Sequence, residues 1–95
     1  MSGIVRVGDL STGHGNFPPR PVITGSDSVF LNGLPVVRVG DVWAEHCDNS
    51  SCHLCNQAVG SSTCFVNGIP LVTQGMATGC GDFVAIGSTD TFSNS

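Results

Sequence analysis

Residues 25–37 read GSDSVFLNGLPVV, and residues 60–72 read GSSTCFVNGIPLV. The two segments are identical at seven of their thirteen positions and lie 35 residues apart. Self-similarity at such a period predicts a chain built from equivalent structural units. In each copy an Asn-Gly pair separates two β-rich runs, a strong signal for a hairpin with a type I′ turn, whose two central residues have positive φ. The repeat therefore predicts β-hairpin units.

Half-copies at the two ends of the sequence supply a third unit. Residues 87–95, GSTDTFSNS, match the first half of the repeat. Residues 5–9, VRVGD, match its second half, which recurs at 37–41 and more weakly, as VTQGM, at 72–76. We expect the two half-units to join and close a ring of three hairpins. The alternative is that the sequence belongs to a longer linear array of such units.

This repeat pattern and the composition predict an all-β fold. The chain has thirteen glycines and many short apolar runs, which are typical of closely spaced turns. No segment shows a 3.6-residue period with helix caps. We expect a single domain over residues 1–95, a small cone with pseudo-three-fold symmetry. In it Thr91–Asn94 pairs with Ile4–Val7, and the long loops between units meet at the apex.

The charge balance excludes several classes of partner. Three Lys and Arg residues stand against seven Asp and Glu, a net charge of −4, which leaves no electrostatic footprint for nucleic acid or an anionic membrane. No run approaches the ~20 apolar residues of a membrane helix. The start MSGIVRVGD lacks the regions of a signal peptide, so we expect synthesis in the cytoplasm without one. Five cysteines, an odd number, favour metal ligation or buried thiols over a disulfide framework.

The loops between the units contain all three histidines. They span residues 9–23, 41–59 and 76–86. His14 and His46 each follow the Asp that ends the preceding strand by five residues, and Cys80 follows Met76 at the third corner by four. Under pseudo-three-fold symmetry these three corners converge near the axis. The sequence therefore predicts that the three side chains lie close together.

His53, in the longest loop, is the fourth candidate ligand. Three imidazoles and one thiolate complete a tetrahedral shell with no open position, which is typical of a structural metal site. Bound metal would supply folding free energy to an apex that has little core of its own. Zinc and iron both suit such a ligand set, and we favour zinc. We predict one transition-metal ion bound by His14, His46, His53 and Cys80.

The segment EHCDNSSCHLC at 45–55 leaves other arrangements open. Cys47, Cys52 and Cys55 could join His46 in a local Cys₃His zinc site. In an oxidising space, a Cys47–Cys52 or a Cys47–Cys55 disulfide is the alternative. Cys64, which aligns with Val29 inside a strand, is most simply a small buried hydrophobic residue.

The sequence offers little support for catalysis. Asp9, Ser11 and His14 are the residue types of a catalytic triad, but no nucleophile-elbow motif accompanies them. A three-histidine metal could activate water only with Cys80 outside its shell, and Glu45 is the one apparent general base. We therefore expect a protein that is not an enzyme. A small metal-dependent hydrolase and a free-standing zinc-binding or redox module remain the alternatives.

These motifs together resemble the PAAR-repeat family. The resemblance rests on VRVGD followed by TGHG, on GS-x₃-F-x-NG-x-P repeated twice, on the loop histidines His46 and His53, and on TGCGD near the end. It implies a small conical all-β protein with a metal near its point, and its metal positions correspond to the four residues named above. Two features depart from the pattern: Gly75-Met76 stands where Gly-Asp is usual, and the cluster of three cysteines is richer than expected.

The resemblance also implies a function. PAAR-repeat proteins cap the trimeric β-helical spike of type VI secretion systems and of contractile phage tails. We expect one chain on one trimer, at the tip of a phage tail spike or of a secretion spike, where it acts mechanically on the target envelope. The sequence has no extension beyond the repeat that could be a toxin, which tilts the expectation toward phage. The candidate spike contacts are apolar residues of the hairpins: Val29, Leu31, Leu34, Val36, Val66, Ile69 and Leu71.

Overall fold

Four antiparallel strand pairs form the framework of the protein in a computed structural model that describes residues 2–15, 17–47 and 51–93. The strands are β1 (Ser2–Gly3), β2 (Phe30–Leu31), β3 (Leu34–Pro35), β4 (Val42–Cys47), β5 (Cys52–Asn56), β6 (Phe65–Val66), β7 (Ile69–Pro70) and β8 (Phe92–Ser93). The pairs are β1–β8, β2–β3, β4–β5 and β6–β7. Within the described residues there is no helix, and hence none long and apolar enough to cross a membrane. The all-β prediction is confirmed.

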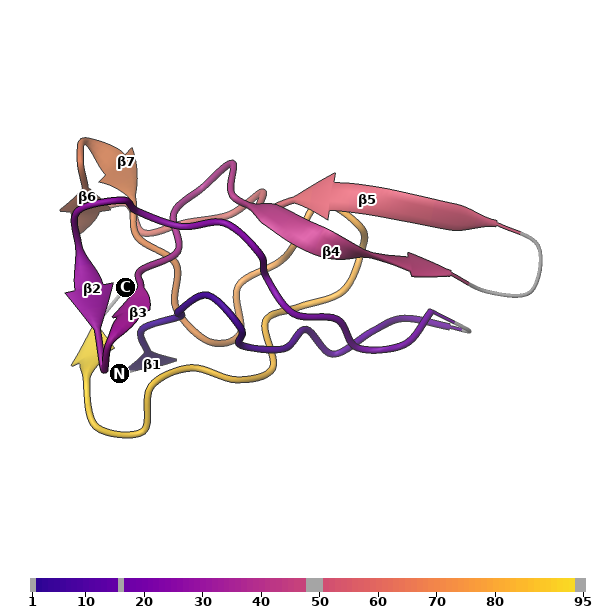
Figure 1. The fold of residues 1–95 in the computed structure, drawn as a ribbon, viewed down its shortest axis with the longest axis horizontal. Coiled ribbons are helices and arrows are strands. Elements are labelled where there is room, and N and C mark those ends of the chain that lie inside the picture. The colour runs from indigo at the N-terminus through magenta and orange to yellow at the C-terminus, as the bar shows by residue number, and fades with distance from the viewer. Residues whose placement is uncertain (1, 16, 48–50, 94–95) are drawn as a thin grey trace.

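The molecule is elongated and tapers from one end to the other. Its principal extents are 38 × 24 × 22 Å. Figure 1 shows the short hairpins β2–β3 and β6–β7 and both chain termini at the wide end, while β4–β5 and the loop near residue 14 reach toward the narrow end. The expected cone is therefore present, with the termini at its base.

The two Asn-Gly hairpins form as the repeat predicts. Asn32 and Gly33 connect β2 to β3 with φ of 55° and 79°, and Asn67 and Gly68 connect β6 to β7 with φ of 54° and 78°. Positive φ at both central residues is the type I′ geometry, whose twist matches that of the flanking strands.

The two ends of the chain pair to complete the third unit. Ser2 lies opposite Ser93 and Gly3 opposite Phe92, and the Ile4 N–H donates to the Thr91 carbonyl at 3.1 Å. Closure of the ring is confirmed. The pairing lies nearer the N-terminus than the expected Ile4–Val7 segment, because the backbone beyond Ile4 is engaged with the other two units.

A ring of three hydrogen bonds marks the pseudo-three-fold axis. The Val5 N–H donates to the Val72 carbonyl (3.1 Å), Val37 donates to Val5 (3.0 Å), and Val72 donates to Val37 (3.3 Å). All three side chains are 0% exposed. Two residues further along each strand the pattern repeats, with bonds from Val7 to Pro35, Val39 to Pro70 and Gln74 to Gly3. Each unit is thus bonded to both of the others.

The third unit replaces a charged pair with a neutral one. In the first unit the Asp9 carboxylate accepts from the Arg6 backbone N–H at 2.8 Å and from its guanidinium. Arg38 and Asp41 repeat this arrangement in the second unit. In the third, the Thr73 N–H donates to the sulfur of Met76 at 3.3 Å. The methionine therefore accepts the same backbone hydrogen bond as the missing carboxylate.

The long segment 41–59 is a hairpin, not the loop that the sequence suggested. Strands β4 and β5 are the longest of the described chain, and the Cys47–Cys52 disulfide joins them near their tip. A bulge between Trp43 and His46 shifts the register, so both side chains point inward, 2% and 3% exposed. In a regular strand, residues three apart face opposite sides. The loop interpretation was wrong because this hairpin has no Asn-Gly turn and its irregular register hides the alternation.

Candidate metal centre

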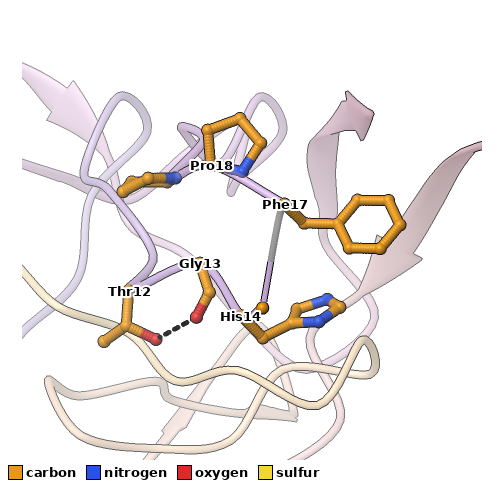
Figure 2. Close-up of a pocket in the computed structure, with 7 residues that line it drawn as sticks. Thr12, Gly13, His14, Phe17 and Pro18 are labelled. Atoms are coloured by element: carbon orange, nitrogen blue, oxygen red, sulfur yellow. Dashed lines mark hydrogen bonds between the residues drawn. The ribbon is translucent and has the colours of Figure 1, made fainter. Parts of the chain in front are cut away.

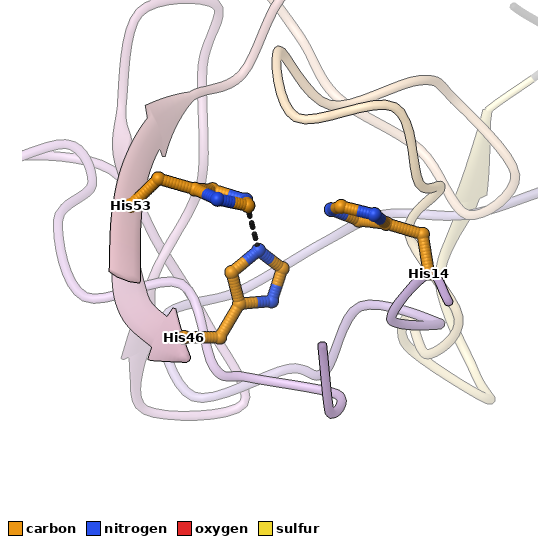
Figure 3. A group of neighbouring side chains, drawn as sticks. All are labelled: His14, His46 and His53. Atoms are coloured by element: carbon orange, nitrogen blue, oxygen red, sulfur yellow. Dashed lines mark hydrogen bonds between the residues drawn. The ribbon is translucent and has the colours of Figure 1, made fainter. Parts of the chain in front are cut away.

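Three histidines meet at the narrow end of the molecule. Figure 3 shows the imidazoles of His14, His46 and His53 directed toward one another from the 9–23 loop, β4 and β5. The ring centroids are 5.0 Å apart for His14 and His46, 5.3 Å for His14 and His53, and 4.3 Å for His46 and His53. One nitrogen from each ring lies within 4.8 Å of the others. Of the four predicted ligands, the structure brings the three histidines together, whereas Cys80 forms a separate group with His46 and Cys55.

Local backbone structure fixes each of these rings. His46 and His53 are directly opposite each other in the β4–β5 pair. His14 sits at a tight turn in which it exchanges two backbone hydrogen bonds with Phe17, at 3.0 and 2.8 Å. Gly13, with φ of 73°, precedes it, and a Cβ there would lie 2.6 Å from the Phe17 carbonyl oxygen. Only glycine fits this position, so the TGHG motif is needed to bring His14 to the cluster.

The hydrogen bonds of His46 set its tautomer. Its Nδ1 lies 3.0 Å from the Pro18 carbonyl oxygen, which can only accept. Nδ1 therefore carries the hydrogen, and Nε2 presents a lone pair. A ring N–H held by a backbone carbonyl is the usual support of a histidine that ligates a metal.

The nitrogens that face the centre of the cluster lack ordinary partners. His46 Nε2 lies 2.6 Å from His53 Nε2, and a hydrogen on the latter would join the two rings by a hydrogen bond. With that hydrogen on His53 Nδ1 instead, both Nε2 atoms present lone pairs. His14 Nε2 is buried and has no hydrogen-bond partner among the described residues. Buried polar atoms are normally satisfied, and a cation would satisfy these lone pairs together. The three histidines fit a metal ion.

Phe17 covers the cluster and was missed by the sequence analysis. Its ring centroid lies 4.9 Å from that of His14, 5.0 Å from that of His46 and 4.3 Å from that of His53. It also lines a cavity of about 330 Å³ beside the cluster, with Thr12, Gly13, His14, Gly15, Pro18 and Pro19 (Figure 2). An aromatic residue three positions after a candidate ligand, just before two prolines, was the available signal. Its ring packs against all three imidazoles.

Cys80 is grouped with one of the three histidines, His46, and its sulfur is bonded to that of Cys55. The Cα atoms of the two cysteines are 5.5 Å apart. Both sulfurs and one ring nitrogen of His46 lie within 4.8 Å of one another. A disulfide sulfur has no thiolate charge to give to a metal, so ligation by Cys80 requires the reduced pair. The assignment of Cys80 as the fourth ligand stays a prediction.

The remaining cysteines do not assemble into the local Cys₃His site. Cys47 and Cys52 are bonded to each other and gather with Glu45, whereas Cys55 joins Cys80. Of the two disulfides left open for Cys47, the structure contains the one to Cys52. Cys64 is half-buried at the wide end and packs against the apolar cluster there, close to the expected environment.

The triad residue types have structural partners. The Asp9 carboxylate accepts from Arg6, and the Ser11 hydroxyl oxygen accepts from the Arg20 backbone N–H at 3.1 Å. These contacts hold the turn and the loop in place.

The match to a known protein family covers the residues of the candidate metal centre. A model of the PAAR motif matches residues 12–85, which is most of the chain. The chain belongs to the PAAR-motif family. A search of curated proteins gave no significant match. The PAAR match includes both Asn-Gly hairpins and all four predicted ligands, and it leaves out the closing strands β1 and β8.

At the wide end of this PAAR protein, the candidate contact residues divide into two groups. Val36, Val66 and Leu71 are buried in a cluster of their own. They form part of the wall of a hollow of about 230 Å³, together with Ile4, Val29, Phe30, Leu31 and Thr91. Leu34 is exposed, and Ile69 is partly buried. The contact role of all seven stays a prediction.

The phenylalanines of the repeat were not among the predicted contact residues. Phe30, Phe65 and Phe92 occupy equivalent positions in the three units and are 55%, 57% and 46% exposed. The GS-x₃-F pattern, present in all three units, was the signal. Because β8 completes the third unit, one phenylalanine belongs to each pair of strands around the base.

Proposed function

We propose that this protein caps the end of a trimeric β-helical spike, one chain per trimer, and forms the point with which the spike enters a target envelope. The observation that carries the proposal is the opposition of the two ends of the molecule. Three equivalent strand pairs stand at the wide end, and three histidines from separate segments meet at the narrow end. The three strand pairs suit a symmetric support, and the histidines suit a tip that is cross-linked by a metal ion.

The wide end has the properties expected of a docking face. Its strands are only two residues long, and its exposed side chains include the three phenylalanines and Leu34. Apolar groups and short strand edges of this kind are normally covered in a functional assembly. A trimer presents three equivalent surfaces about one axis, and this base presents three equivalent units about its pseudo-three-fold axis.

At the narrow end, His14, His46 and His53 would hold one transition-metal ion, zinc rather than iron, with Cys80 as fourth ligand when it is reduced. Such an ion supplies a structural cross-link. The residues that it would tie together come from the 9–23 loop and the β4–β5 hairpin, and Cys80 would add the third loop. Metal binding of this kind contributes directly to folding free energy.

The role is mechanical, not enzymatic. A tip must have a small cross-section and resist unfolding under load, and its tapered form and cross-linked loops meet both needs. The same properties suit a phage tail baseplate and a type VI secretion spike. In either setting the protein would be found at the end of the spike.

Native mass spectrometry of the chain with a purified trimeric β-helical spike protein tests this function. We expect a complex of one chain with one trimer. A complex of three chains per trimer, or no complex with spikes of either system, would contradict it. A monodisperse protein that does not bind such spikes would favour a free-standing metal-binding or redox module. Metal-dependent hydrolysis of a substrate would favour the hydrolase.

A further inference from the structure

The Cys55–Cys80 disulfide and the histidine cluster share a residue. One ring nitrogen of His46 lies within 4.8 Å of those of His14 and His53, and one lies within 4.8 Å of the two sulfurs. His46 is buried, Cys55 is buried in the main apolar cluster, and Cys80 packs against that cluster. His46 therefore connects the sulfur pair to the candidate metal centre.

Cys55 has no counterpart in the other loops of the repeat. It is on β5, opposite Trp43 in the β4–β5 hairpin. Its Cα lies 5.5 Å from that of Cys80, within the range from which two cysteines can form a disulfide without movement of the backbone. The chain thus places a second thiol beside the one that symmetry assigns to the metal.

The oxidation state of this pair decides what Cys80 can bind. As half of a disulfide its sulfur has no thiolate to offer, whereas two-electron reduction with uptake of two protons yields two thiols. Loss of a proton to solvent then gives the Cys80 thiolate, a strong ligand for zinc. The three imidazoles are available in both states.

We propose that Cys55 makes the apex a redox-dependent site with two alternative cross-links. In the reduced protein, a transition-metal ion is held by the three histidines and the Cys80 thiolate. In the oxidised protein, the Cys55–Cys80 bond ties β5 to the third loop and the ion loses its sulfur ligand. This inference rests on the metal site of the proposed function and adds its dependence on oxidation.

A low-molecular-weight disulfide such as oxidised glutathione is the oxidant of the switch. The more accessible Cys80 sulfur attacks one sulfur of the reagent and releases the first reagent thiol, leaving a mixed disulfide. The Cys55 thiolate then attacks the Cys80 sulfur, which forms the Cys55–Cys80 bond and releases the second reagent thiol. The two protein thiols lose two electrons and two protons, and the reagent gains both.

Titration with cobalt(II) alone tests the switch, because a thiolate ligand gives a sulfur-to-cobalt charge-transfer band. The full chain is titrated after reduction by a dithiol and again after treatment with oxidised glutathione and removal of the reagent. We expect the band only in the reduced protein and at least about tenfold weaker cobalt binding in the oxidised one. Peptide mapping should find Cys55 linked to Cys80 in the oxidised sample.

Three variants identify the cysteines responsible. Cys55→Ser should stop at the mixed disulfide, so peptide mapping should find glutathione on Cys80 and no intramolecular link. Cys80→Ser should lack the band in both states. The Cys47→Ser, Cys52→Ser double variant removes the disulfide between the next residue pair of the hairpin, whose side chains alternate in face with His46 and His53, and it should behave as the wild type. A band that survives oxidation in the wild type overturns the switch and leaves the metal site standing. Absence of cobalt binding in both states overturns the metal site itself, and the wild-type arms decide this even if a variant fails to fold.

Discussion

His46 and His53 face each other across the β4–β5 hairpin with their Nε2 atoms 2.6 Å apart. The Pro18 carbonyl holds the hydrogen of His46 on Nδ1, so the Nε2 atom of His46 presents a lone pair at this short contact. The His14 Nε2, buried without a partner among the described residues, completes the group. The arrangement leaves acceptor nitrogens at the tip to which a metal ion could bind.

Metal should therefore stabilise the protein strongly. We expect one zinc ion per chain by elemental analysis, and a gain in unfolding free energy of about 4 kcal/mol when free zinc exceeds its dissociation constant about a thousandfold. The His14→Ala, His53→Ala double variant should lose both. Cys64→Ser, at the opposite end of the molecule, should keep full zinc content, and full content in the double variant would refute the ligand assignment.

Removal of the last nine residues should destabilise the whole protein and not merely shorten a tail. Residues 87–95 contain β8, and Ser88 bonds to the Ile4 carbonyl through its backbone N–H at 2.8 Å. Without them β1 loses the strand with which it pairs, and the third unit of the ring is incomplete. Thermal unfolding of this truncation should occur well below that of a control chain that ends at Ser93. Equal melting temperatures would show that the ring does not depend on its closure.

The Asn-Gly turns should not tolerate a side chain at glycine. Gly33 has φ of 79°, and no atom lies within 4 Å of the position that a Cβ would occupy. The effect of Gly33→Ala is therefore backbone strain alone, which costs about 1–2 kcal/mol for a left-handed residue. Asn32→Gly, which removes a side chain at the neighbouring position, separates strain from lost contacts. Denaturant unfolding of both variants measures the difference.

Acid should remove the contribution of the Asp90 carboxylate to the stability of the folded protein. Hydrogen bonds from Ser88 first, and then from Asn32 and Thr91, hold the pKa of this carboxyl below its ordinary value. Because the folded-state pKa is the lower one, the stabilisation is present above the unfolded-state pKa and is lost as the pH falls through the folded-state pKa. Asp90→Asn should thus melt below the wild type at neutral pH, and the two curves should converge in acid. A difference in melting temperature between the two proteins that stays constant across the pH range would show that the effect does not depend on the carboxylate charge.

Much of this fold could be predicted because the repeat encodes it locally. Asn32-Gly33 and Asn67-Gly68 specify their turns by backbone preference alone, and symmetry then places His14, His46 and Cys80 at one end. The β4–β5 hairpin could not be found in this way, because its register depends on a bulge that buries Trp43 and His46 together. The partnership of Cys55 with Cys80 is equally non-local, since it joins β5 to the third loop across a sequence separation of 25 residues.

The docking face gives the last prediction, which depends on the separation of the two ends. Leu34 and Ile69 each follow an Asn-Gly turn and pair with Leu31 and Val66 across their hairpins. Aspartate at both positions places charge on a surface that a spike trimer must desolvate, and it leaves the histidine cluster at the far end untouched. We expect the Leu34→Asp, Ile69→Asp variant to lose spike binding in native mass spectrometry while it retains one zinc per chain. Asp27→Lys, an exposed change on the loop before β2, serves as the matched control and should bind normally. Undiminished binding by the double variant would mean that the spike contacts another surface, and loss of zinc would mean that the substitutions had disrupted the fold.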